Sequence, residues 1–168
     1  IPVEYKKLPK IVSKGDLIYL NDGFIQLRVQ ELKREEVECK VIIGGELLSH
    51  KGLNLPGKRI LTDAVTERDL KWVEFGLEEN VDAFGISFVE DSDDIIRVKE
   101  FASKKGKQAF TVAKIERAVA VKNIDEILSV ADAIMIARGD LGVETKIENL
   151  PMVQKNLIHK ANRFCKPV

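Results

Sequence analysis

The fold is decided by the stretch AFTVAKI at residues 109–115, an almost continuous apolar run about as long as one β-strand. Two similar runs flank it, AFGISFV at residues 83–89 and AIMIA at residues 133–137. Helical patterns lie between the three runs, and such apolar strands belong to parallel sheets whose two faces are covered by helices. We therefore predict an α/β fold for residues 58–168, with three successive β/α units.

Helices are predicted beside each of these strands. Thr66 followed by Asp69 is typical of a helix N-terminus, because the two side chains can cap each other's backbone N–H groups. An apolar stripe follows at helical spacing, so the first helix is expected directly after this pair. The other helices are expected over residues 92–105, 123–130 and 150–164.

Residues 1–57 have a different rhythm, in which short β-rich runs alternate with turn residues. Residues 16–20 lead into the sequence NDG at residues 21–23, whose Asp-Gly step favours a tight hairpin turn, and residues 24–32 form the returning strand. Another strand is expected over residues 37–43, ending at a pair of glycines. This part of the chain is therefore predicted to be a small β domain or most of one.

The composition excludes several classes of protein. The 168 residues include 27 Lys and Arg against 27 Asp and Glu, and 45% are hydrophobic, as in soluble globular proteins. The chain has neither a long basic run nor an apolar run of about 18 residues, so no nucleic-acid or membrane partner is expected. Cys39 and Cys165 lie outside any metal-binding pattern and no signal peptide is visible at Ile1, so we expect a cytoplasmic protein.

Three β/α units are too few for a closed (β/α)₈ barrel, which has eight units and about 250 residues. An open doubly wound sheet is the alternative, but its first strand is usually followed by a Gly-rich phosphate-binding turn. Here the first apolar run is followed by the acidic sequence EDSDD at residues 90–94. We therefore favour part of a larger barrel over a small open sheet.

Lys114 and Glu116 stand at the end of the second apolar run. The two-residue period of a strand places both side chains on the same side. The carboxyl end of a parallel strand is where α/β enzymes carry catalytic groups. An ordinary salt bridge is an equally good interpretation of this spacing.

The third run ends in ARGDLG at residues 137–142. Asp140 and Glu116 would then lie at the ends of neighbouring strands and offer two oxygen ligands to a hard cation such as Mg²⁺. Residues 141–145 could begin a short helix whose free N–H groups bind an anion. The alternative is a simple Gly-Asp-Gly turn with a capping Asp.

The sequence SHKGLNLPG at residues 49–57 lies at the junction of the two halves. Lys51 stands among Gly, Asn and Pro, and this setting suits a lysine that contacts a phosphate from a hinged lid. The alternative interpretation is an interdomain linker.

Taken in chain order, these segments resemble the pyruvate kinase family. The resemblance implies an α/β fold consisting of a partial TIM (β/α)₈ barrel with an inserted small all-β lid domain. Residues 1–57 would be the β-barrel-like lid domain, incomplete at its N-terminal side, and residues 58–168 the middle β/α units of the barrel. Further matching blocks are GG at residues 44–45, SFV at 87–89, DEI at 125–127 and KPV at 166–168.

The resemblance also implies a reaction of glycolysis, the transfer of phosphate from phosphoenolpyruvate to ADP to give pyruvate and ATP. By matched position, Lys114 would be the catalytic and substrate-binding lysine that stabilises the phosphoryl group in flight and the enolate oxygen. Glu116 and Asp140 would hold Mg²⁺ or Mn²⁺, and the backbone at Gly139 and Asp140 would bind the carboxylate end of the substrate. Lys51 would come down with the lid onto the nucleotide phosphates.

Further expectations follow from the same resemblance. A K⁺ site would lie outside this segment, the whole protein would be a homotetramer, and the isolated segment would be inactive. The pattern of the family is broken at Glu90, where Arg is frequent, and at Arg117, where many members have Asn. Two other functions stay open: a metal-dependent lyase or aldolase of an enolpyruvate-type substrate, and a non-catalytic binding fragment.

Overall fold

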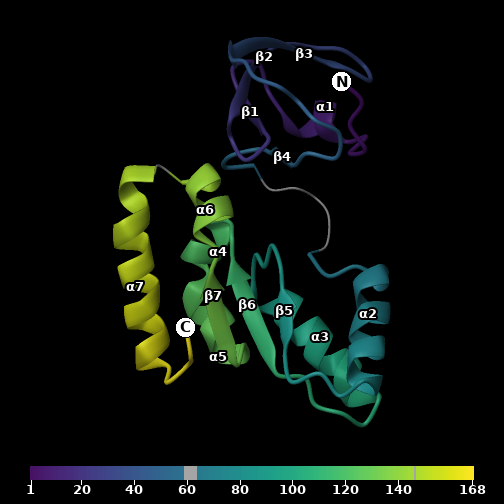
Figure 1. Cartoon of the computed structure of the whole chain (residues 1–168), viewed down its shortest axis with the longest axis vertical. Helices are drawn as coiled ribbons and strands as arrows, with labels where there is room; N and C mark the ends of the chain where they lie inside the picture. Colours follow the sequence, from purple (N-terminus) through teal and green to yellow (C-terminus); the bar gives the residue numbers. More distant parts are fainter. Residues whose placement is uncertain (59–63, 146) are drawn as a thin grey trace. The chain divides into compact units, whose positions relative to one another are not determined.

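The computed structural model describes residues 1–58, 64–145 and 147–168. The chain has a mixed α/β structure and divides into two compact units, Ile1–Leu61 and Thr62–Val168. Figure 1 shows the strands and helices of each unit, which we call unit 1 and unit 2. No helix in the described part of the chain has the length and apolar character needed to cross a membrane.

Unit 1 is built on an antiparallel sheet with the strand order β3-β2-β1-β4. The predicted hairpin is confirmed between β1 and β2, and Asn21, Asp22 and Gly23 have positive φ angles of 51°, 56° and 86°. The elements are α1 (Leu8–Ile11), β1 (Leu17–Leu20), β2 (Ile25–Leu32), β3 (Val37–Ile43) and β4 (Leu53–Asn54).

Residues 49–57 do not form a plain interdomain linker, so that interpretation is wrong. Strand β4 lies within this stretch and pairs with β1, with Leu20 opposite Leu53. The next residue, Leu55, is buried in a hydrophobic cluster with Ile18 and Val29. The segment therefore belongs to the folded part of unit 1.

Unit 2 contains a parallel sheet with the strand order β5-β6-β7. The three predicted strands are confirmed, each shorter than its apolar run. The expected helix at residues 123–130 has a separate short helix in front of it. The elements are α2 (Glu67–Glu78), β5 (Phe84–Ile86), α3 (Ser92–Lys104), β6 (Thr111–Ile115), α4 (Ala118–Lys122), α5 (Ile124–Val130), β7 (Ala133–Ile136), α6 (Arg138–Glu144), a 3₁₀ turn (Ile147–Asn149) and α7 (Leu150–Arg163).

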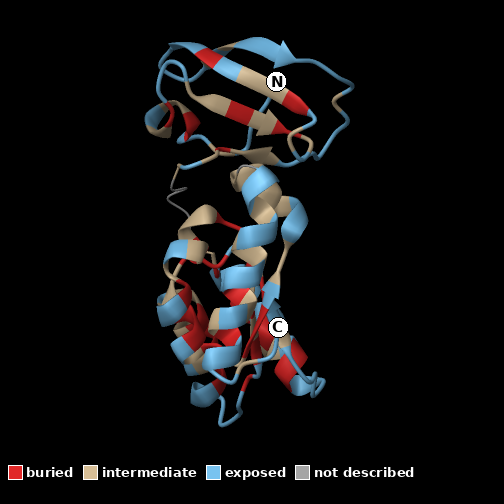
Figure 2. Ribbon diagram, turned by 90° about the vertical axis from the view of Figure 1, so that its left-hand side faces the viewer, coloured by how far each residue is buried: buried red, intermediate tan, exposed pale blue. Residues whose placement is uncertain are grey.

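The core of unit 2 lies on one face of this sheet. Ala113 and Ile115 of β6 are buried, whereas Val112 and Lys114 between them are only partly covered. Met135 of β7 is 50% exposed. Figure 2 shows the buried residues gathered between the strands and the helices of unit 2. The expectation that these strands are covered on both faces is therefore not met within the described part of this chain.

The amino ends of β6 and β7 are joined through the side chain of Asp132. Its Oδ2 atom accepts hydrogen bonds from the backbone N–H of Thr111 at 2.8 Å and from the Thr111 hydroxyl at 2.9 Å. Lys99 of α3 forms an ion pair with the same carboxylate at 2.9 Å. Burial alone would raise the pKa of Asp132, but the hydrogen bonds from Lys99 and Thr111 lower it below the usual value of 3.8.

We predict that Asp132→Asn lowers the free energy of unfolding by about 1–2 kcal/mol at pH 7, because the Lys99 ion pair is lost and the Thr111 hydrogen bonds are weakened. The lowered pKa of Asp132 stabilises the folded state above the usual carboxyl pKa of 3.8, and this contribution disappears as the pH falls through the folded-state value. Urea unfolding at pH 7 and near pH 3 should show the gap between the two proteins closing in acid. A gap of the same size at both pH values would contradict the assignment.

Candidate active site

The carboxyl ends of β5, β6 and β7 lie at one edge of the parallel sheet (Figure 1). Ile115, the last residue of β6, is aligned with Ile136, the last residue of β7. The backbone N–H of Ala137 also donates to the carbonyl of Ile115 at 3.2 Å. Glu116 and α6 therefore follow directly from the ends of two neighbouring strands.

Lys114 and Glu116 form an ion pair at this edge. The distance from Lys114 Nζ to Glu116 Oε1 is 2.6 Å, and the Glu116 side chain is only 1% exposed while that of Lys114 is 28% exposed. The partly exposed lysine can reach a ligand, and the buried carboxylate is held in a fixed place. The structure thus brings together the two residues that the strand period placed on one side.

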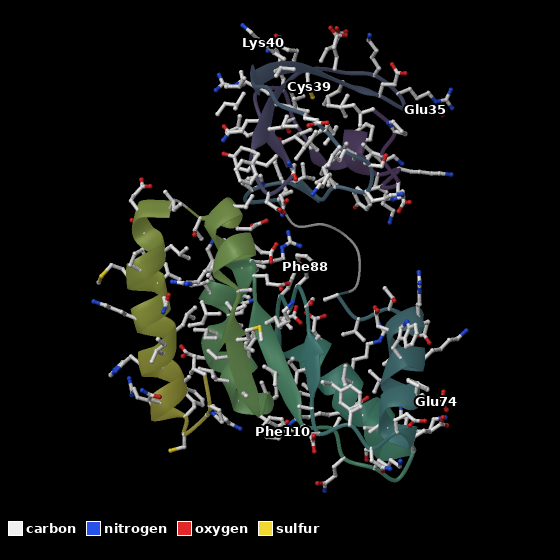
Figure 3. The ribbon with its side chains drawn as sticks, viewed as in Figure 1. Glu35, Cys39, Lys40, Glu74, Phe88 and Phe110 are labelled. Atoms are coloured by element: carbon white, nitrogen blue, oxygen red, sulfur yellow. The ribbon has the colours of Figure 1, made fainter. Side chains whose placement is uncertain are left out.

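The loop after β5 forms hydrogen bonds with both members of this ion pair. The backbone N–H of Phe88 donates to Glu116 Oε2 at 2.7 Å, and Lys114 Nζ donates to the Ser87 hydroxyl at 2.7 Å. Phe88 has a φ of 55°, a left-handed conformation that is unfavourable for a bulky residue and persists only when its surroundings impose it. Figure 3 shows Phe88 at this end of the sheet and Phe110 at the opposite end.

No role is predicted from the sequence for Ser87 or Phe88, although both belong to the SFV block at residues 87–89. Their position at the end of a buried strand was the available signal. The positive φ of Phe88 could not be predicted from the sequence, because a positive φ is usually expected only at glycine or asparagine. The ion pair between Glu90 and Arg117, whose side chains meet at 2.7 Å, was not predicted from the sequence either.

Helix α6 begins immediately after β7, with Ala137 as its N-cap and no side-chain cap. Gly139 and Asp140 lie in its first turn, and neither Gly139 nor Gly142 has a positive φ. The alternative of a Gly-Asp-Gly turn is therefore wrong, and the short helix begins at Arg138 and not at residue 141. Backbone N–H groups in a first helical turn have no partner within the helix.

The surroundings of Gly139 leave room for a ligand. A Cβ atom built on Gly139 would have no neighbour within 4 Å. Asp140, the next residue, is partly buried. Open space thus adjoins the first turn of α6 on the side of this glycine.

The donor set at this edge suits a divalent cation that is shared with a substrate. Among the described residues, no group of three or more His, Cys, Asp and Glu could enclose a metal ion. Mg²⁺ is usually held by one or two carboxylates together with water and substrate oxygens. Glu116 and Asp140 fit that pattern, and they do not fit a closed structural metal site.

Lys51 lies in unit 1, whereas the other candidate residues lie in unit 2. It is exposed, and it stands between His50, which has a φ of 60°, and Gly52. The carbonyl of Gly52 accepts a hydrogen bond from the Asn21 backbone at 3.1 Å. The loop that carries Lys51 is thus tied to the hairpin turn between β1 and β2.

Comparison with known proteins gives a consistent result over the whole chain. The family model described as "Pyruvate kinase, barrel domain" matches residues 1–168. A pyruvate kinase of Thermococcus litoralis is 57% identical over 168 residues, covering 100% of this chain and 35% of the relative. A pyruvate kinase of Staphylococcus aureus is 41% identical, covering 99% of this chain and 29% of the relative. The chain thus spans about a third of the length of these relatives.

We expect Lys114→Met to lower the free energy of unfolding at pH 7 by about 1–3 kcal/mol, because the buried Glu116 carboxylate loses its cation. The loss should be smaller than for a fully enclosed pair, since Lys114 is 28% exposed. The double variant Lys114→Met/Glu116→Gln should recover part of it, because a neutral amide needs no counter-charge. Urea unfolding measures both effects, and unchanged stability of Lys114→Met would refute the pairing.

Proposed function

Because this chain belongs to the pyruvate kinase family, we propose that the whole protein transfers the phosphoryl group of phosphoenolpyruvate to ADP, giving pyruvate and ATP. Membership confirms the resemblance inferred from the sequence motifs. The observation that carries the proposal is the ion pair between Lys114 and the buried Glu116 at the carboxyl end of a parallel strand. Phosphoryl transfer depends mainly on positioning and on charge stabilisation, and this site provides both.

Lys114 is the residue that we assign to charge stabilisation. Its ammonium group is partly exposed and is oriented by Glu116 and by the Ser87 hydroxyl. A cation that is already oriented loses little on meeting the charge that develops in the transition state. In our proposal it faces the transferred phosphoryl group and the enolate oxygen of the product.

Glu116 and Asp140 are the residues that we propose as ligands of Mg²⁺ or Mn²⁺. The Phe88 N–H holds one oxygen of Glu116, and such outer partners orient a ligand before the ion arrives. When bound, the divalent ion would neutralise negative charge on substrate oxygens. A K⁺ site, if the reaction needs one, would come from residues outside this segment.

The first turn of α6 is our proposed site for the substrate carboxylate. The N–H groups of Gly139 and Asp140 lie in this turn, and helix N-termini favour anions. The open space at Gly139 supports a ligand close to the backbone. Lys51, in an exposed loop of unit 1, is our proposed contact for the phosphates of ADP and ATP.

We further propose that unit 1 is a lid domain and that unit 2 supplies the middle β/α units of a TIM barrel. The antiparallel sheet of unit 1 and the three parallel strands of unit 2 support this division. A homotetramer acting in the cytoplasm is the corresponding proposal for the whole protein. A lyase or aldolase and a non-catalytic fragment are not favoured, because both relatives compared above are pyruvate kinases.

The decisive assay is ADP-dependent formation of pyruvate from phosphoenolpyruvate by the whole protein. We predict that Lys114→Met lowers kcat by at least about 10²-fold, as loss of one preorganised charge stabiliser does. Lys104→Met is the matched control, because Lys104 is an exposed lysine at the end of α3, and it should keep normal turnover. Both variants are assayed without urea, at a temperature at which circular dichroism shows that they are folded. Pyruvate release without ADP would favour a lyase.

A separate prediction concerns the metal ligands. Glu116→Gln and Asp140→Asn should each weaken Mn²⁺ binding by at least about tenfold, because each removes a charged oxygen ligand. Titration followed by electron paramagnetic resonance measures the free ion directly. Glu100→Gln, at an exposed position of α3, serves as the control of equal charge. Unchanged Mn²⁺ affinity in either ligand variant would remove that residue from the proposed site.

A further inference from the structure

We propose that Glu90 and Arg117 are positioning residues, whose ion pair holds the loop after β5 in the conformation that directs the Glu116 carboxylate. The inference rests on the proposed function, because it concerns the residue that we assign as a metal ligand. Neither side chain has a role in the site described so far. Glu90 lies in the loop after β5, which ends at Ile86, and Arg117 lies two residues after β6, which ends at Ile115.

The contacts between the two loops continue the register of the strands. Ile86 of β5 is paired with Ala113 of β6. Beyond these residues the partners advance together along both segments, and each contact uses at least one side chain in place of the backbone ladder. They are Lys114 with Ser87 at 2.7 Å, Glu116 with Phe88 at 2.7 Å and Arg117 with Glu90 at 2.7 Å.

The Glu90–Arg117 contact is the ion pair of this series, and both of its side chains are nearly buried. The side chains of Arg117 and Glu90 are 9% and 11% exposed. A buried ion pair recovers little net stability after the cost of desolvation, so stability alone gives a weak reason for its presence. A planar guanidinium does fix direction well, since its donors have a rigid arrangement.

Glu90 is itself held at several points, which makes it a firm anchor. Its backbone N–H donates to Asp94 Oδ2 at 2.8 Å, and its carbonyl accepts from Asn123 Nδ2 at 3.0 Å. Its neighbour Val89 is fully buried. Arg117 therefore connects the start of α4 to a part of the β5 loop that has little freedom to move.

Phe88 is the residue through which this anchor reaches Glu116. It stands two positions before Glu90, and its backbone N–H holds Glu116 Oε2. Its φ of 55° is unfavourable for phenylalanine. The loop must therefore be restrained on both sides of Phe88, by Ser87 before it and by Glu90 after it. Without the Arg117 contact, the later restraint is weakened and Phe88 can relax away from Glu116.

The test uses the whole protein and three variants, Arg117→Met, Glu90→Gln and the exchanged pair Glu90→Arg/Arg117→Glu. Arg97→Met is the matched control, because it breaks a comparable 2.7 Å ion pair with Glu67 on the surface between α2 and α3. Hydrogen–deuterium exchange of the peptide containing Phe88 reports the loop without any metal. Mn²⁺ titration and the separation of kcat from the KM for ADP report the site.

We expect at least tenfold faster exchange at Phe88 and at least about tenfold weaker Mn²⁺ binding in Arg117→Met and Glu90→Gln. The value of kcat should fall in both variants, while the KM for ADP stays unchanged. The exchanged pair should restore part of each loss. Arg97→Met should show none of these effects. Normal exchange at Phe88 in Arg117→Met, or faster exchange with unchanged Mn²⁺ affinity, would overturn the proposal.

The same measurements separate this inference from the proposed function. If the unsubstituted protein forms no pyruvate from phosphoenolpyruvate and ADP, the proposed function fails. Exchange at Phe88 and Mn²⁺ affinity still decide whether the ion pair positions Glu116. If turnover is normal but neither readout responds to Arg117→Met, the positioning role fails and the proposed function stands.

Discussion

A carboxylate removed from water must obtain its compensating charge and hydrogen bonds from the protein, and Glu116 is 1% exposed. Lys114 supplies the charge and the Phe88 backbone supplies a hydrogen bond. Meeting this requirement forces the loop after β5 to lie against the end of β6, in a conformation that Phe88 would not otherwise adopt. The geometry of the candidate site follows from the need to satisfy this one buried charge.

The two ends of the parallel sheet are organised for different purposes. At the amino end, Asp132 binds Thr111 and Lys99, and these contacts stabilise the fold. At the carboxyl end, the ion pair of Lys114 and Glu116 leaves the lysine partly open to a ligand. This division agrees with the general behaviour of parallel α/β proteins, in which the carboxyl ends of the strands carry the chemistry and the opposite ends carry stability.

The face of the sheet that carries Lys114 is also the less covered one. Val112 and Lys114 are partly buried and Met135 is half exposed, although the strands have the apolar composition of strands covered on both sides. Our proposal that unit 2 belongs to a TIM barrel accounts for this difference, because the side chains inside such a barrel pack against those of other strands. The same placement would enclose the stem of Lys114 and leave its ammonium group at the end of the barrel.

The sequence by itself determined the local features of this protein. The capping pair of Thr66 and Asp69, the NDG turn, the three parallel strands and the meeting of Lys114 with Glu116 all depend on short-range periodicity or on side chains that bond nearby backbone. The family could also be inferred, because its motifs occur in order along the chain. Only the tertiary structure decided which loop satisfies Glu116, that Phe88 turns left-handed and that Glu90 meets Arg117. These contacts join residues about thirty positions apart, and their geometry depends on how strands and helices pack, which no local pattern encodes.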